Sequence, residues 1–154
     1  MVTADMLPLS LLYERDETAW LETMSALVAE GRLAEINHHN LSEYLSDMAK
    51  RDRREVESRL IVLLAHMLKW VHQPERRSGS WQATIIEQCQ ELEGLLGRGV
   101  LYNHAESVLA TSYLKAVKRA VAETGKTDTA FPINCPYSLD QMLTANLFAE
   151  EGPK

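Results

Sequence analysis

The sequence predicts an all-α protein, a four-helix bundle of the up-down type followed by a short C-terminal helix. Large apolar residues recur every three or four positions along most of the chain, which is the period of a helix face that packs on a core. Valine and isoleucine fall at these helical positions and not in the alternating pattern of a half-buried strand. Capping residues, prolines and glycines stand where the helices would begin and end.

The length and composition fit one domain. A chain of 154 residues that is 45% hydrophobic can bury a core of ordinary size. Because it has no linker-like tract and no repeat, we expect a single helical domain over residues 1–154 with its core at about 11–148. The first residues lack the pattern of a secretory signal, and the longest apolar run, at 60–65, is far too short to cross a bilayer. We therefore expect a cytoplasmic protein without a membrane span.

The first helix is expected to begin after Asp16 and to end at Gly31. Asp16 suits an N-cap and glycine suits a helix C-terminus. Between them one apolar stripe is formed by Trp20, Met24, Leu27 and Val28. Residues 32–39 are predicted to form a connector with at most one helical turn.

The second helix is expected to be long. Asn40 and Glu43 resemble a capping box, and apolar residues then recur at helical spacing to about Val71. The segment 49–55 has no apolar residue larger than alanine, so solvent exposure or a bend is expected there. Pro74 ends the helix because its ring clashes with a continuing helical backbone.

Two further helices and a tail complete the predicted bundle. The third helix is expected to be capped by Ser80, with a buried stripe of Trp81, Ile85, Cys89, Leu92 and Leu96. The fourth is expected at 102–124, with Gly125 as its terminator. Residues 131–137 carry two prolines and should be extended, and a capping box at 138–141 should start the short last helix.

The densest group of polar and aromatic residues lies between Trp70 and Trp81, a turn that we call the elbow. Basic side chains beside a helix N-terminus can bind an anion, because the free backbone N–H groups and the helix dipole both favour negative charge. Candidate ligand-binding residues are Lys69, Trp70, Gln73, Arg76, Arg77 and Trp81. The alternative, which we prefer, is that the arginines clamp the turn by pairing with Glu75, Glu43 or Asp47.

A metal site is a weaker hypothesis. His39, Glu43 and Asp47 are spaced by four residues, and His38, His66 or His72 could add a ligand. The chain does not have the two Glu-x-x-His motifs that di-iron bundles require, and it has no His-Glu-x-x-His motif. His39 is expected to precede the helix cap. We therefore predict no metal and no cofactor.

Nucleophilic catalysis is disfavoured as well. Cys89 falls on an apolar stripe, Cys135 stands beside a proline, and neither has a neighbouring base in the sequence. No Gly-x-Ser-x-Gly elbow and no glycine-rich phosphate loop is present. We predict no catalytic residue, and both thiols are expected to stay reduced.

The charge distribution is uneven. Residues 50–77 hold eight basic and four acidic side chains, so this segment carries +4 while the whole chain carries −6. Nucleic acid could bind such a stripe, but acidic residues interrupt it and i, i+4 ion pairs such as Arg51 with Glu55 account for most of it. Nucleic acid is therefore a disfavoured partner.

Several phrases of the chain resemble a bacterial family known as domain of unknown function 29. They are Leu12-Tyr13-Glu14-Arg15-Asp16 with Trp20-Leu21, Glu43 with Asp47-Met48, Glu57-Ser58-Arg59-Leu60, Leu68-Lys69-Trp70, Gln73-Pro74-Glu75-Arg76-Arg77-Ser78 with Trp81, Glu123-Thr124-Gly125, and Phe131-Pro132 with Cys135-Pro136-Tyr137. The resemblance covers residues 11–148 and implies an all-helical bundle from a family without an assigned activity. Family members are richer in acid around 37–47, where this chain has His38, His39, Tyr44 and Ser46.

The favoured function is a non-catalytic protein-interaction or regulatory module that binds a protein partner or associates with itself. One alternative is a protein that binds a small phosphate or nucleotide-like anion at the elbow, and another is an enzyme that acts at the elbow. The weakest alternative is a nucleic-acid-binding accessory protein. A flat exposed apolar patch on the first or fourth predicted helix would favour the interaction module. A concave pocket with convergent polar groups at the elbow would favour the ligand binder.

Overall fold

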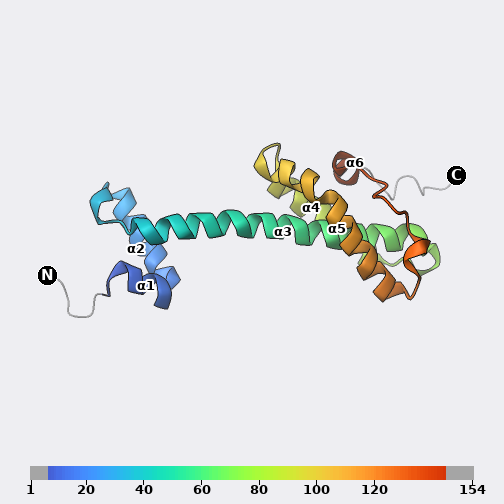
Figure 1. Cartoon of the computed structure of the whole chain (residues 1–154), viewed down its shortest axis with the longest axis horizontal. Coiled ribbons are helices and arrows are strands. Elements are labelled where there is room, and N and C mark those ends of the chain that lie inside the picture. The colour runs from blue at the N-terminus through green and yellow to red at the C-terminus, as the bar shows by residue number, and fades with distance from the viewer. Residues whose placement is uncertain (1–6, 145–154) are drawn as a thin grey trace. The chain divides into compact units, whose positions relative to one another are not determined.

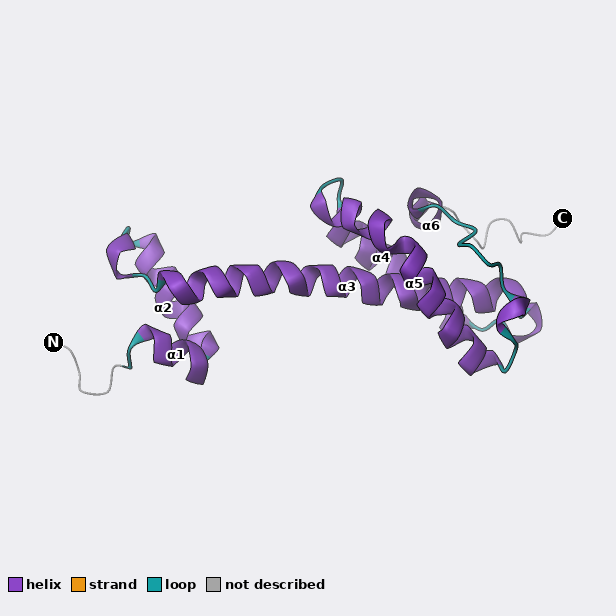
Figure 2. Cartoon of the chain, in the orientation of Figure 1, coloured by secondary structure: helices purple, strands orange, loops and turns teal. Residues whose placement is uncertain are grey.

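The computed structural model describes residues 7–144 and is helical (Figures 1 and 2). Residues 7–144 contain no strand, so the all-α prediction is confirmed. The α-helices are α1 (Leu9–Arg15), α2 (Glu17–Ala29), α3 (His38–His72), α4 (Gly79–Leu96), α5 (Val100–Thr124) and α6 (Leu139–Thr144). Single 3-10 turns form η1 (Leu33–Glu35), η2 (Pro74–Arg76) and η3 (Asp128–Ala130).

The chain divides into two compact units, residues 1–50 and 51–154. The boundary falls within α3, in the polar segment 49–55, whose side chains are mostly exposed as predicted. The same segment is helical throughout, so the solvent exposure predicted for it occurs without an interruption of the helix.

The core of the first unit forms around Trp20. Its indole is fully buried, stacks edge-on against Tyr13 at 4.7 Å between ring centroids, and contacts Tyr44 at 5.6 Å. The indole Nε1 donates to the Asn37 side-chain oxygen at 3.2 Å. Asp16 caps α2 as predicted, by accepting a hydrogen bond from the Ala19 amide. These contacts connect α1, α2 and the start of α3.

The sequence prediction for the first unit was wrong in three places. Helix α1 was not predicted, because its seven residues lack a capping side chain and a clear apolar stripe. Val28 is exposed, while its neighbour Leu27 takes the buried position. Helix α3 begins at His38, so Asn40 lies inside the helix and is buried instead of forming a capping box.

The core of the second unit is built from three helix faces. Residues 51–72 of α3 supply its centre, and α4 and α5 cross this part of α3 (Figure 1). The predicted stripe of α4 packs against it, with Ile85, Leu92 and Leu96 buried. Helix α5 contributes mainly small residues, which allow close helix approach. Fully buried core residues include Val56, Leu60, Leu63, Leu64, Ala65, Leu92, Ala105, Ala116 and Ala120.

The tail after α5 is held on the second unit by specific contacts. Gly125 ends α5 at φ 73°, in the left-handed region where glycine is favoured. The buried Phe131 side chain packs in the core, and the Tyr113 hydroxyl donates to the Pro132 carbonyl at 2.6 Å. The capping box predicted at 138–141 is present, because the Ser138 hydroxyl accepts from the Gln141 amide at 3.1 Å and the Gln141 side chain accepts from the Ser138 amide at 2.9 Å.

The N-cap of α4 is Ser78 and not the predicted Ser80. The Ser78 hydroxyl accepts a hydrogen bond from the Trp81 amide at 3.2 Å, and helix α4 therefore starts two residues earlier than predicted, at Gly79. Ser78→Ala is expected to lower the free energy of unfolding by about 1 kcal/mol, the usual effect of losing a serine cap. Ser80→Ala is the matched control and should change it by less than about 0.5 kcal/mol. Urea denaturation followed by circular dichroism measures both; equal losses would exclude Ser78 as the cap.

Candidate functional site

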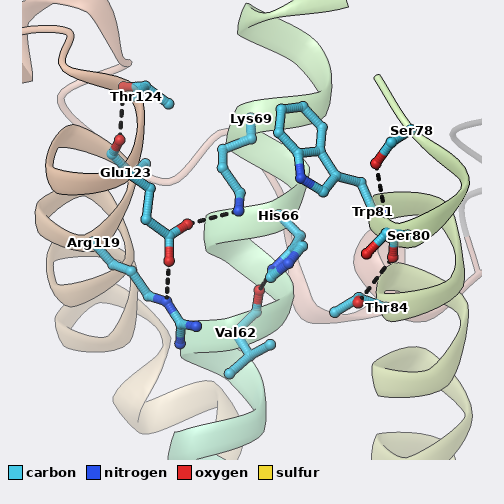
Figure 3. A network of polar contacts seen from close by, with 11 residues as sticks. Val62, His66, Lys69, Ser78, Ser80, Trp81, Thr84, Arg119, Glu123 and Thr124 are labelled. Carbon is cyan, nitrogen blue, oxygen red and sulfur yellow. Dashed lines mark hydrogen bonds and ion pairs between the residues drawn. The ribbon is translucent and has the colours of Figure 1, made fainter. Parts of the chain in front are cut away.

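Lys69 lies on α3 directly before the elbow and is buried. Its side chain is 8% exposed, and its Nζ donates to the Glu123 carboxylate of α5 at 2.6 Å. On the other side the ammonium lies 5.0 Å from the centroid of the Trp81 ring. Figure 3 shows Lys69 on α3 between Glu123 and Trp81, so this side chain joins α3, α4 and α5.

The carboxylate of Glu123 connects a second basic residue. Arg119 Nε donates to it at 3.0 Å within α5. Partial burial raises the pKa of Glu123, but the hydrogen bonds from Lys69 and Arg119 outweigh it and bring the pKa below its ordinary value. Nearby, burial lowers the pKa of His66, whose Nδ1 lies 2.8 Å from the Val62 carbonyl oxygen (Figure 3). The network is therefore an ion-pair cluster that packs helices together.

Arg77 closes the turn over Trp70. Its Nε donates to the Trp70 carbonyl at 2.7 Å, and its guanidinium carbon lies 4.9 Å from the centroid of the Trp70 ring. This carbonyl belongs to the last turn of α3, where backbone acceptors have no partner within the helix. The arginine thus contacts both the backbone and the aromatic face of a residue seven positions earlier, and its contacts clamp the turn.

The remaining elbow residues differ in exposure. Gln73 is buried, whereas Glu75 and Arg76 are exposed on η2. Within residues 7–144, no ion pair or side-chain hydrogen bond involves Arg76. Arg76 is therefore the elbow cation that a solvent anion can reach most readily.

Of the candidate acidic and metal residues, His38, His39, Glu43 and Asp47 lie on the first-unit part of α3. Helix α3 begins at His38, so His39 is inside its first turn, contrary to the prediction that it precedes the cap. Glu43 and Asp47 are exposed. The pKa of Tyr13 is raised, mainly by desolvation and further by the negative charges of these two carboxylates. In the part of the chain that the structure describes, no three His, Cys, Asp or Glu side chains gather as a metal site. A pairing of Glu43 or Asp47 with the elbow arginines stays a prediction.

The two thiols have surroundings that suppress their reactivity. Burial raises the pKa of Cys89 to about 11, and its Sγ donates to the Met142 carbonyl at 3.5 Å. Burial also raises the pKa of Cys135.

Because the thiolate is the nucleophile, Cys89 is expected to react with iodoacetamide at pH 8 at least about tenfold more slowly than in the urea-unfolded chain. Mass spectrometry measures the rates, and equal rates would contradict this burial.

The sequence prediction missed an apolar surface on α5. Leu114 is 62% exposed and Ile133, in the tail beside it, is 88% exposed. A shallow cavity of about 390 Å³ is lined by both, together with Glu106, Ala110 and other residues of α5 and the tail. A second, of about 680 Å³, is lined by Leu114, Val117 and Lys118 among others. We call the surface formed by Glu106, Ala110, Leu114, Val117, Lys118 and Ile133 the α5–tail face.

The signal for this surface was present in the sequence. Leu114 lies off the predicted buried side of the fourth helix. That side consists of Ala105, Val108, Leu109, Tyr113, Ala116, Val117, Ala120 and Val121. Ile133 stands in a segment that two prolines keep from joining a helix. A large apolar residue off the buried stripe indicates an exposed contact surface when others lie beside it.

Comparisons with known proteins give one family. A family model with the description "Domain of unknown function DUF29" matches residues 12–148, in agreement with the resemblance found in the sequence. No curated protein and no solved structure matches the chain. Among residues 7–144, no helix combines the length and the apolar content that crossing a membrane requires.

Proposed function

Because the chain belongs to the DUF29 family, which carries no assigned activity, we propose a function from its surface: a non-catalytic protein-interaction module that binds through the α5–tail face. The observation that carries this proposal is the exposure of Leu114 and Ile133 beside shallow apolar cavities. Exposed apolar residues that adjoin one another mark interaction surfaces in soluble proteins. This surface lies on α5, the fourth helix of the predicted bundle.

The contacts of the elbow support the same proposal. Lys69 is paired with Glu123, and Arg77 is bound to the Trp70 carbonyl. An anion that entered the elbow would compete with these contacts, and Lys69 would have to leave a buried ion pair. We therefore assign Lys69, Trp70, Arg77 and Trp81 a structural role.

Site-specific photo-crosslinking in the source cell tests the interaction function. A benzophenone amino acid replaces Leu114 in the full chain, and the control replaces Glu87, which is exposed on α4. We expect position 114 to crosslink reproducibly to a protein that mass spectrometry identifies, and position 87 not to. If neither position gives a protein adduct, the interaction function is wrong.

A second candidate function is the binding of a small phosphate-type or nucleotide-like anion at Arg76. This side chain is exposed and stands three residues before α4. In the first turn of α4 the Trp81 amide donates to Ser78, whereas the amides of Gly79 and Ser80 have no acceptor within the helix. To test this function, the melting temperature is measured while inorganic phosphate or an adenosine nucleotide is added. A ligand that binds only the native state raises its stability and so raises the melting temperature. A rise that Arg76→Ala abolishes would support this function, and no rise in the parent chain would exclude it.

We also propose that the chain is one cytoplasmic domain with the up-down four-helix arrangement. One domain unfolds in a single cooperative transition. Trp20 reports on the first unit, while Trp70 and Trp81 report on the second. Coincident fluorescence transitions of the parent chain and of Trp20→Phe would support one domain, and separated transitions would contradict it.

A further inference from the structure

We propose that the partner of the α5–tail face is a second copy of this chain, bound with the two α5 helices antiparallel about a twofold axis that passes between Ala110 and Leu114. This inference rests on the proposed interaction function and names its partner. It comes from one row of exposed residues on α5, namely Glu106, Ala110, Leu114 and Lys118. Residues four apart form a ridge along a helix surface, and packing such ridges together is the commonest way in which helices meet.

The order of residues in this ridge allows it to pair with the same ridge of a second copy that runs in the opposite direction. It runs acidic, small, large, basic from Glu106 to Lys118. When a second copy is turned antiparallel about an axis between Ala110 and Leu114, Glu106 faces Lys118 of the other copy, and Ala110 faces Leu114. Each large side chain then meets a small one, and each charge meets its opposite. A twofold interface requires this self-complementarity, because the same patch serves both copies.

The surroundings of the ridge fit the same partner. The cavity of about 390 Å³ is lined by Glu106, Ala110, Leu114 and Ile133, so it offers an apolar hollow where Leu114 of the second copy would arrive. Neither Glu106 nor Lys118 takes part in an ion pair within residues 7–144. Both charges are exposed, so their pairing fixes direction and register more than it adds affinity.

The first test is the oligomeric state of the full chain by size-exclusion chromatography with light scattering. We expect a dimer that dissociates on dilution. Leu114→Glu should raise the dissociation constant at least tenfold, since it places two carboxylates at the centre of the interface. Ile86→Glu is the matched control, because Ile86 is an exposed apolar residue of α4, and it should leave the dimer intact. Circular dichroism confirms that both variants fold.

Charge reversal tests the antiparallel register. Glu106→Lys alone and Lys118→Glu alone each create two like-charge pairs and should weaken the dimer by about tenfold at low salt. Mixing the two single variants should give a heterodimer of parental affinity, and the double variant should recover the homodimer. A dimer that Leu114→Glu leaves intact, or single variants that fail to rescue each other, would overturn the proposed pairing.

The oligomeric state and the crosslinking result together distinguish failure of the dimer proposal from failure of the interaction function on which it rests. A monomeric parent chain whose position 114 still crosslinks to a different, identified protein overturns the second copy as partner and leaves the interaction function standing. A monomeric chain without any crosslink overturns both.

Discussion

Leu64→Ala is expected to lower the free energy of unfolding by about 2–5 kcal/mol, the range for truncating a fully buried leucine. Leu64 has no exposed surface and belongs to the core that α3, α4 and α5 share. The change removes buried apolar surface and leaves a cavity, and the two effects add. Urea denaturation followed by circular dichroism measures the loss.

The control uses the same substitution on the same helix. Leu45 is also on α3 but is exposed, so Leu45→Ala should change the free energy of unfolding by less than about 0.5 kcal/mol. Comparable losses at positions 45 and 64 would show that the buried face of α3 is assigned incorrectly.

Glu123→Ala is expected to lower the free energy of unfolding by about 2–3 kcal/mol, because it leaves the buried ammonium of Lys69 without its carboxylate. Removing one member of a fully buried pair costs about 3–5 kcal/mol, and the effect here is smaller because Glu123 is partly exposed. Thermal and urea unfolding measure the loss. Arg119→Ala breaks only the more exposed pair and should cost less than about 1 kcal/mol.

A double variant separates the ion pair from helix packing. Lys69→Met with Glu123→Gln removes both charges while keeping similar volumes, and it should recover most of the stability lost in Glu123→Ala. If the double variant is as unstable as the single one, the buried charge is not the cause of the loss.

The pH dependence of this pair has a defined sign. The pKa of Glu123 is lower in the folded chain than its ordinary value of 4.5, so its ionised form is favoured by folding. Its contribution is therefore present at neutral pH and is lost as the pH falls below about 4.5. The difference in stability between the parent chain and Glu123→Gln should shrink over that range.

The helical elements of the second unit could be predicted from the sequence because their signals agree with one another. The α4 stripe from Trp81 to Leu96, the glycine after α5 and the Ser138 capping box each combine helical spacing with a matching boundary residue. The N-cap of α4 is the exception, because it was predicted at Ser80 and the structure has Ser78 there. Ser78 is selected because its hydroxyl reaches the Trp81 amide.

Helix α1 and the role of the elbow could not be predicted in the same way. Helix α1 depends on the contact of Tyr13 with Trp20, which is a tertiary contact and leaves no local pattern. The elbow residues were identified as a group, but the partner of Lys69 lies 54 positions later, at Glu123. A sequence pattern shows which residues can form ion pairs, and only the fold shows which pairs form.

The claim that the contact surface is the α5–tail face is tested most directly by hydrogen–deuterium exchange. The exchange rates of backbone amides in the full chain are compared at low and at high protein concentration. If the two copies meet at this face, residues 131–137 of the tail should exchange more slowly at high concentration, and residues 73–79 of the elbow should exchange at an unchanged rate. Protection that grows with concentration at 73–79, with none at 131–137, would contradict it.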